Sequence, residues 1–292
     1  MSASKPWRAT VNGLKLAGLQ WQAKQPHAIP ILALHGWLDN AASMQPLLDA
    51  LHEKQGAATL ALDLPGHGLS AHTPANWHAP FLEYVDHTLA VLDGQRWPQI
   101  DLIGHSMGGA IATLFAAAFS ERVRRLILLD SIGPLSGSAE QFSADIRKGL
   151  LARRSVAQKV MPSYASVAQA VAARTGSFGI SANAARVIVQ RGLVKRAGRY
   201  FWRTDPRLTT PSISRITEPQ VLQAISTISA PTIIVLAEPR SSFLDTPLIE
   251  HRFAHFKHAK IITIPNSNHH LHLDSMAAVM SALLNFDADL AP

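Results

Sequence analysis

The chain has 292 residues, of which 47% are hydrophobic and 16% are charged, and it contains no cysteine. This composition excludes a disordered chain, disulfide bonds, thiolate metal sites and a cysteine nucleophile. The formal net charge is +7, and it is unevenly placed, because residues 135–220 hold 14 basic and 4 acidic side chains while the rest of the chain is net negative. This asymmetry indicates either solvated helix faces or a field that attracts anionic substrates or anionic surfaces.

No segment of the sequence has the pattern of a targeting signal or a membrane span. Residues 1–21 lack an uninterrupted apolar stretch, and the most apolar segment, 102–119, is interrupted by glycines and by His105 and Ser106. The basic residues come without a zinc-finger, RRM or KH signature, so a nucleic-acid partner is not expected. We therefore expect a soluble, cytoplasmic protein with no membrane span, and the sequence leaves its oligomeric state open.

Apolar strands alternate with helical patterns over the first part of the chain. Asn12-Gly13 lies between two strand-like runs and predicts a hairpin. Such alternation favours a mostly parallel sheet with helices on both faces. The predicted strands are 7–11, 14–21, 29–34, 57–62, 100–103 and 125–129, and the predicted helices are 43–52, 77–92 and 107–119.

The pattern changes after Pro134. Helical periodicity covers 138–154 and 181–197, capping-box patterns begin at Ser138 and Thr217, and no strand pattern occurs between 135 and 229. Strand patterns return at 232–236 and 260–264, and a last helix is predicted at 274–285. The sequence thus predicts an α/β core made of residues 1–134 and 230–292, with a helical insertion at 135–229.

The strongest motif is Gly104-His105-Ser106-Met107-Gly108-Gly109, which follows a predicted strand and opens a predicted helix. A serine on a sharp strand-to-helix turn presents its hydroxyl above the sheet, next to the free N–H groups of the helix. Ser106 is therefore the candidate nucleophile. An oxyanion needs two preorganised donors, and the backbone N–H groups of Met107 and Trp37 are the candidates.

The chain has 14 histidines, so position must select the general base. His269 opens a histidine cluster after the last predicted strand and is the preferred base, whereas His270 and His272 are interpreted as supporting or packing residues. His270, His272 and Asp274 could resemble a metal-ligand group, but no second group of ligands accompanies them. We therefore expect neither a metal nor a cofactor.

These motifs, in this order, resemble those of the α/β-hydrolase superfamily over nearly the whole chain. The loop His35-Gly36-Trp37-Leu38-Asp39-Asn40 and the C-terminal histidine cluster resemble most closely the capped serine hydrolase-like proteins. The resemblance implies an α/β-hydrolase fold with a mostly parallel central sheet. It also implies that the insertion is a cap over the active site.

The resemblance further implies a triad acid in a G-x-x-D turn after the penultimate strand. The matching turn is 237–240, where Arg240 stands in place of the aspartate. Asp130 follows the strand 125–129, at the position where some capped relatives, such as certain haloalkane dehalogenases, carry their acid. We rank Asp130 first, then Glu238 at the end of the later strand, and then Asp245.

The sequence favours a serine hydrolase that cleaves a small carboxylic ester or thioester through a Ser-His-acid triad and an acyl-enzyme, and an anionic substrate is one option. Serine rather than aspartate at position 106 argues against dehalogenase and epoxide-hydrolase chemistry. Two alternatives remain open. One is a non-catalytic binding protein, which only Arg240 supports, and the other is C–C cleavage, acyl transfer or peroxide formation on the same fold.

Overall fold

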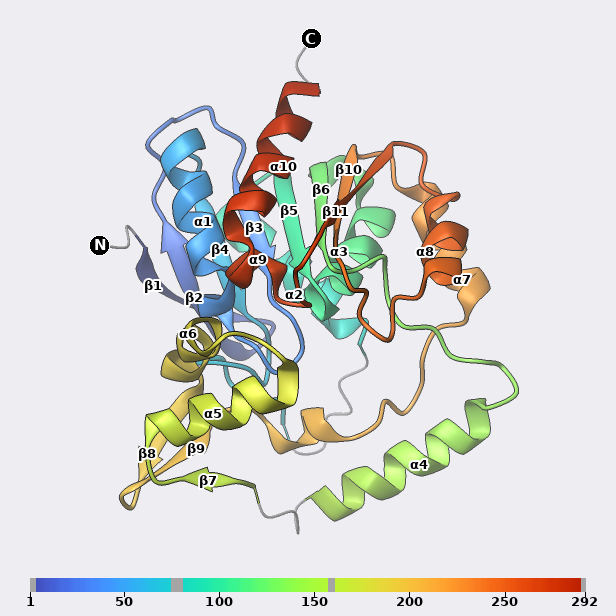
Figure 1. Ribbon diagram of the computed structural model, residues 1–292. Coiled ribbons are helices and arrows are strands. Elements are labelled where there is room, and N and C mark those ends of the chain that lie inside the picture. The colour runs from blue at the N-terminus through green and yellow to red at the C-terminus, as the bar shows by residue number, and fades with distance from the viewer. Residues whose placement is uncertain (1–3, 75–80, 157–160, 290–292) are drawn as a thin grey trace.

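The computed structural model describes residues 4–74, 81–156 and 161–289, and a mixed sheet of eight strands lies at its centre (Figure 1). The strand order is β1-β2-β4-β3-β5-β6-β10-β11. The first two strands form an antiparallel hairpin, β2 is antiparallel to β4, and the remaining strands are parallel. The strands are β1 Lys5–Val11, β2 Leu14–Trp21, β3 Ile31–Leu34, β4 Thr59–Asp63, β5 Ile100–His105, β6 Val123–Leu129, β10 Thr232–Ala237 and β11 Ala259–Ile264.

The central strands are buried on both faces, as their continuous apolar sequences require. Every residue of β3, β4, β5 and β10 is buried. One apolar layer contains α1 (Ala41–Gln55), α9 (Leu271–Asp274) and α10 (Met276–Asp289), and the other contains α2 (Glu83–Gln95), α3 (Met107–Ala118) and α8 (Thr246–Phe253). The fold class predicted from the sequence is therefore confirmed.

The chain reverses its direction of winding between β3 and β5. From β3 the chain passes through α1 to β4 on one side, and from β4 it returns through α2 to β5 on the other side. The loops after β3 and β5 therefore leave toward opposite faces of the sheet. Such a switch point, at the carboxyl ends of parallel strands, is where α/β sheets bind ligands.

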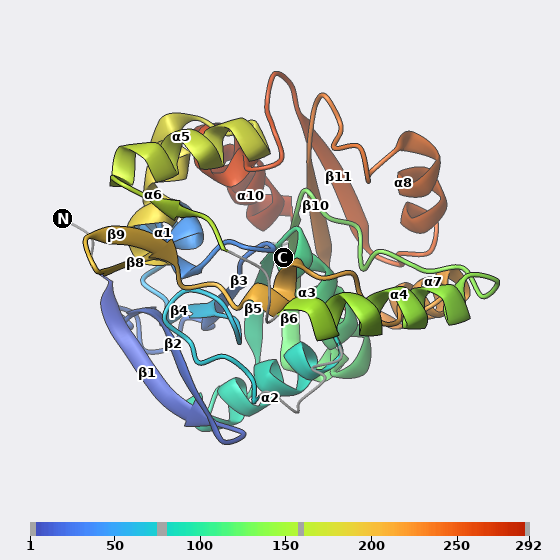
Figure 2. The ribbon, with the colours of Figure 1, turned by 90° about the horizontal axis from the view of Figure 1, so that it is seen from below.

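Residues 135–229 are called the insertion below, and its described residues up to Thr217 lie at this carboxyl edge of the sheet (Figure 2). The insertion forms α4 (Phe142–Ser155), α5 (Val167–Phe178), α6 (Ala182–Gly192) and α7 (Glu218–Thr227), and α7 packs against α3 of the core. A short 3-10 helix spans Pro206–Thr209. A small sheet, ordered β7-β9-β8, contains Ser163–Tyr164, Arg199–Trp202 and Leu193–Arg196.

Several local predictions for the insertion are wrong. The predicted absence of strands fails, because the helix predicted at 181–197 ends at Gly192 and the chain turns back at Ala197-Gly198, which both have positive φ. The predicted capping box at Ser138 is a local turn instead, since α4 begins at Phe142. The capping box at Thr217 is confirmed.

Other predicted boundaries also move. The helix predicted at 77–92 partly lies outside the described residues, and its described part, α2, runs from Glu83 to Gln95. The last predicted helix is split into α9 and α10, and α5 and α8 were not predicted. None of the helices within the described residues is both long and apolar enough to cross a bilayer.

Candidate active site

Ser106 stands at the sharp turn between β5 and α3. Its backbone has φ 51° and ψ −114°, a conformation that non-glycine residues rarely adopt and that concentrates at functional sites. Its N–H donates to the Leu129 carbonyl at 3.0 Å, which ties the turn to β6. The neighbouring glycines make the turn possible. A Cβ on Gly104 would lie 2.5 Å from Gly109 Cα, and one on Gly108 would lie 2.5 Å from the Leu34 carbonyl carbon.

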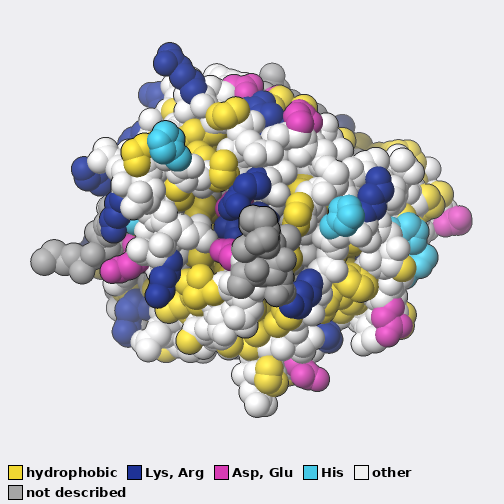
Figure 3. Space-filling model, turned by 90° about the horizontal axis from the view of Figure 1, so that it is seen from above, with side chains coloured by type: hydrophobic (Ala, Val, Ile, Leu, Met, Phe, Trp, Pro, Cys, Tyr) yellow, Lys and Arg dark blue, Asp and Glu magenta, His cyan; other side chains and the backbone are white. Residues whose placement is uncertain are grey.

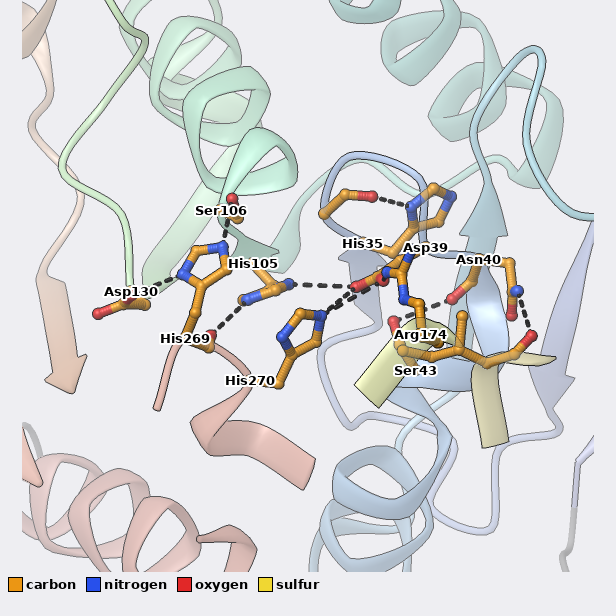
Figure 4. A network of polar contacts seen from close by, with 12 residues as sticks. His35, Asp39, Asn40, Ser43, His105, Ser106, Asp130, Arg174, His269 and His270 are labelled. Carbon is orange, nitrogen blue, oxygen red and sulfur yellow. Dashed lines mark hydrogen bonds and ion pairs between the residues drawn. The ribbon is translucent and has the colours of Figure 1, made fainter. Parts of the chain in front are cut away.

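His269 lies between Ser106 and Asp130 (Figure 4). Its Nε2 is 2.8 Å from Ser106 Oγ, and its Nδ1 is 2.6 Å from Asp130 Oδ2. Because a carboxylate only accepts, Nδ1 carries the proton and Nε2 is free to accept the serine proton. The structure therefore brings together the three side chains that the sequence ranked first as nucleophile, base and acid.

Asp130 is completely buried at the end of β6, with φ 45°. Its Oδ1 accepts from the Ala237 N–H at 2.9 Å, and its Oδ2 accepts from the Ser241 hydroxyl at 2.7 Å. Burial alone would raise its pKa, but the hydrogen bonds from His269, Ala237 and Ser241 hold the pKa of Asp130 below its ordinary value. The carboxylate thus stays ionised where it orients the histidine.

The other two candidate acids lie elsewhere. Glu238 is exposed, and its backbone joins the end of β11 through its N–H to Ile264. Asp245 is exposed and caps α8 by accepting from the Leu248 N–H at 2.8 Å. Arg240, at the position where the resemblance led us to expect an aspartate, donates to the Ala237 carbonyl and to Thr263 Oγ1. The structure therefore does not bring either alternative acid to His269.

The loop after β3 passes beside the nucleophile. A Cβ on Gly36 would lie 3.3 Å from Ser106 Cβ, so the backbone leading into Trp37 runs next to the serine. Met107 is the first residue of α3, on the other side of Ser106. Both candidate oxyanion donors therefore belong to segments that border the serine side chain, while the Trp37 indole donates to the Leu208 carbonyl at 2.8 Å.

A buried polar cluster lies beside His269, and its ion pair was not predicted, although His270 was interpreted as a supporting or packing residue. Asp39 is ion-paired with Arg174 of α5, and His270 Nε2 lies 3.2 Å from Asp39 Oδ2. Burial would raise the pKa of Asp39, but His270 and Arg174 hold it well below the ordinary value. Asp39 lies in a recognised motif, whereas no pattern in the sequence distinguishes Arg174 from the other basic residues of the insertion.

His105 connects this cluster to the loop that carries His269. Burial lowers the pKa of His105 to about 4, so the imidazole is neutral at neutral pH. Its Nε2–H donates to the carbonyl oxygen of His269 at 2.8 Å, and its Nδ1 faces Asp39 Oδ2 at 3.6 Å. The residue preceding the nucleophile therefore helps to hold the backbone of the histidine.

Within the described ranges, one group of side chains has the spacing of a metal site. Ligand atoms of Asp39, His105 and His270 lie within 4.8 Å of one another. The Arg174 guanidinium already lies against this carboxylate and would repel a second cation. Asp274, which was grouped from the sequence with His270 and His272 as a candidate metal ligand, instead accepts from the Ser181 N–H and from the Asn268 amide. The donor set therefore fits an internal ion pair better than a metal.

The same loop after β3 also attaches the insertion to the site. Besides the Trp37 and Asp39 contacts, the Asn40 amide donates to the Ile188 carbonyl of α6 at 2.9 Å. Nearby, Arg191 at the end of α6 forms a two-pronged ion pair with the buried Asp63, the last residue of β4. Polar side chains of the core thus hold α5 and α6 against the carboxyl edge of the sheet.

Comparison with known proteins agrees with this architecture. The sequence model of the alpha/beta hydrolase family matches residues 31–282 of this chain. A serine hydrolase-like protein of Dictyostelium discoideum is 31% identical over 94% of this chain and 79% of its own length. An sn-1-specific diacylglycerol lipase of Danio rerio is 25% identical over 88% of this chain and 78% of its own.

A solved structure is similar over the whole chain. The crystal structure of a hypothetical protein from Pseudomonas aeruginosa PAO1 is 34% identical, with a TM-score of 0.88 over 99% of this chain and all of the other. The family match covers most of the chain, including the turn of Ser106 and the loop of His269. The chain therefore belongs to the alpha/beta hydrolase family.

Proposed function

We propose that this hydrolase cleaves a small carboxylic ester or thioester, with Ser106 as nucleophile, His269 as general base and Asp130 as the triad acid. The observation that carries the proposal is the continuous line of hydrogen bonds from Ser106 Oγ through the imidazole to the buried carboxylate, at 2.8 and 2.6 Å. The ester class is supported by the name of the lipase relative from Danio rerio.

In the first half of the reaction, Ser106 Oγ attacks the carbonyl carbon while His269 Nε2 takes its proton. Asp130 holds the imidazole in the required tautomer and stabilises the imidazolium. The N–H groups of Met107 and Trp37 would stabilise the oxyanion. The imidazolium then protonates the leaving alcohol or thiol, and the acyl group remains on Ser106.

In the second half, His269 takes a proton from water, and the hydroxide attacks the acyl carbon. The second oxyanion collapses, the carboxylic acid leaves, and Ser106 recovers its proton from the imidazolium. His105 would act here only as a positioning residue, because it holds the His269 carbonyl and touches none of the reacting atoms.

The insertion at 135–229 would act as a cap on the core of residues 1–134 and 230–292. The support is that Trp37, Asp39 and Asn40, which lie in the loop beside Ser106, contact the 3-10 helix, α5 and α6, respectively. A cap held in this way would form the wall of the substrate site and would exclude water from it.

Ser106→Ala tests the proposal. The variant should fold normally, lose labelling by a fluorophosphonate probe, and lose turnover of a short p-nitrophenyl ester by roughly 10⁴–10⁶-fold. Substantial residual turnover in Ser106→Ala would exclude Ser106 as the nucleophile. A parent protein that neither reacts with the probe nor turns over any ester would instead favour the non-catalytic alternative.

The acid is tested separately by comparing Asp130→Asn with Glu238→Gln. Asparagine at 130 favours the wrong tautomer of His269 and should lower kcat by about 10⁴-fold. Glu238→Gln should leave kcat within about twofold, because that side chain is exposed and its role is confined to the turn. The reverse ranking would move the acid to the later loop.

A further inference from the structure

Exposed apolar side chains gather on and beside α4. Nine large hydrophobic side chains of the described residues are exposed, and four of them belong to this segment. Leu135 precedes α4 and is 48% exposed, and Leu151 within it is 53% exposed. Phe142 and Leu150 are the other two. Gly149 is the one buried residue of this helix. Such a concentration on one helix indicates an interaction surface.

The same helix carries exposed positive charge. Arg147, Lys148 and Arg154 are exposed, whereas Arg153 is half-buried on the side of α4 that faces the rest of the insertion. The only acidic side chain of α4 is Asp145, which is half-buried. The exposed face of α4 is therefore both basic and apolar, which is the combination that binds anionic lipid surfaces.

Three further basic residues of the insertion, unlike the exposed Arg186, Lys195, Arg196 and Arg215, have internal partners. Arg174 and Arg191 are ion-paired with core aspartates, and Arg207 is ion-paired with Asp205. They contribute little to an outward field. The opposite side of the molecule differs from α4, since Lys and Arg side chains are dispersed there over many elements (Figure 3).

The helix α4 also lies at the same edge of the sheet as the active site (Figure 2). Phe243, which is 39% exposed, places its ring edge-on to His269 with 5.1 Å between centroids, and the nearby Trp37 is 45% exposed. Exposed apolar rings thus border the reacting groups, and the basic apolar helix is on the same side.

We propose that α4 docks the protein on an anionic lipid bilayer, with Arg147, Lys148 and Arg154 at the headgroups and Leu150 and Leu151 in the interface. The docking is independent of the proposed hydrolysis. A second copy of the chain is disfavoured as the occupant, because two α4 faces would bring like charges together. An acidic protein partner would satisfy the charges but is a different proposal, and the experiment separates the two.

The experiment measures co-sedimentation of the full-length protein with vesicles of phosphatidylcholine alone and of phosphatidylcholine mixed with phosphatidylglycerol. The parent should bind the anionic vesicles, and binding should weaken as salt is raised. The triple variant Arg147→Gln, Lys148→Gln, Arg154→Gln should bind about a hundredfold more weakly, because each basic residue near such a surface contributes about 1 kcal/mol. Leu150→Ser with Leu151→Ser should also weaken binding, by about tenfold or more.

The matched control replaces three exposed lysines at the opposite edge of the sheet, Lys24→Gln, Lys54→Gln and Lys257→Gln, with the same change in net charge. This control should lose less than about threefold in binding. Circular dichroism and thermal unfolding show that all variants fold. Fluorophosphonate labelling without vesicles should be unchanged, so a failure of docking is distinguished from a failure of the hydrolase proposal.

Three outcomes would overturn the docking proposal. Equal losses in the α4 variant and the lysine control would mean that net charge alone drives binding. Absence of binding, or binding without preference for anionic vesicles, would exclude an anionic lipid partner. Self-association that depends on Leu150 and Leu151, measured by light scattering in the absence of vesicle binding, would make a second copy the occupant of this face.

Discussion

The two ends of the insertion are attached to the core in opposite ways. At the end formed by α5 and α6, the buried Arg174 and the partly buried Arg191 are ion-paired with Asp39, in the loop after β3, and with Asp63, the last residue of β4. At the other end, α4 buries only Gly149 and exposes most of its large side chains. One end is held by charges that water does not reach, and the other end turns its charges toward water.

Lys and Arg side chains thus have two different roles at the two ends of the insertion. A buried arginine–carboxylate pair orients its elements, because removing either partner leaves an uncompensated charge in the interior. An exposed arginine contributes little to stability and is available to a partner. The positive excess of the insertion therefore includes a structural part near the active site and an outward part, to which α4 contributes.

The largest difference is expected from removing one arginine at each end. Arg174→Gln leaves the buried Asp39 without its guanidinium partner, and it also removes the cation that lies 3.8 Å from the centre of the Phe178 ring. The free energy of unfolding should fall by about 3–5 kcal/mol in urea titrations. Arg154→Gln on α4 should change it by less than about 0.5 kcal/mol.

A double variant serves as the control for this pair. Asp39→Asn combined with Arg174→Gln should recover part of the lost stability, because neither charge is then left alone. Similar small losses for Arg174→Gln and Arg154→Gln would show that the buried pair does not hold the insertion.

Acid should affect the site end of the molecule through its buried histidines. Burial lowers the pKa of His67 to about 3, and His67 lies edge-on to His35 with 5.0 Å between ring centroids. As pH falls below about 6.5, the unfolded chain binds a proton that the folded chain does not, so stability falls with falling pH. His67 alone should account for about 2–3 kcal/mol between pH 6.5 and 4.5.

The free energy of unfolding, measured across this pH range in the parent and in His67→Gln, tests the direction and the size of this pH dependence. The variant should lose less stability on acidification. The difference between the two free energies of unfolding should therefore grow as pH falls below about 6.5. Parallel curves would mean that His67 is protonated in the folded state. His105, whose pKa burial also lowers to about 4, acts in the same direction, and α4 contains no histidine.

The same substitution at two glycines of the insertion should have unequal effects. A Cβ on Gly192 of α6 would lie 3.0 Å from the Trp202 ring and 3.3 Å from the Asn40 amide, in a helix held by the Arg191 ion pair. A Cβ on Gly149 of α4 would be tighter still, 2.9 Å from Ile213 Cα. Gly192→Ala should nevertheless cost more, about 1–2 kcal/mol, because α6 has no room to move.

Gly149→Ala should change the free energy of unfolding by less than about 0.5 kcal/mol, since α4 can shift outward and alanine favours the helix. Thermal unfolding of both variants gives the comparison. Limited proteolysis should cut Gly149→Ala more readily near α4, and a larger loss of stability for Gly149→Ala than for Gly192→Ala would contradict the unequal attachment.

The smallest effect is expected for the attraction of an anionic substrate. With Arg174 and Arg191 neutralised by aspartates, the outward field near the site is modest, and kcat/KM for an anionic ester should decline by only about threefold from low to high salt. A neutral ester of similar size should show no decline. Equal curves for the two esters would show that the charges of the insertion do not act on substrate entry.

Much of the architecture could be predicted from the sequence because it depends on local patterns. Continuous apolar runs are typical of strands buried on both faces, and the hairpin at Asn12-Gly13 follows from two residues with positive φ. Ser106 could be ranked first because glycines around a serine, between a strand and a helix, restrict the backbone to one turn. Asp130 and His269 were chosen because they follow strands at the positions where the resemblance places the acid and the base, and the carboxyl ends of parallel strands meet at one edge.

The remaining features depended on contacts between distant segments. No periodicity could select Asp130 over Glu238, because the choice depends on which carboxylate reaches His269 Nδ1 across the strand ends. The pairing of Arg174 with Asp39 joins residues 135 positions apart, and the neutral state of His105 follows from burial. The sequence by itself determined the strands, the turn of Ser106 and the excess of positive charge. Only the tertiary structure decided which charges are buried, because burial sets both the partner and the protonation state of each group.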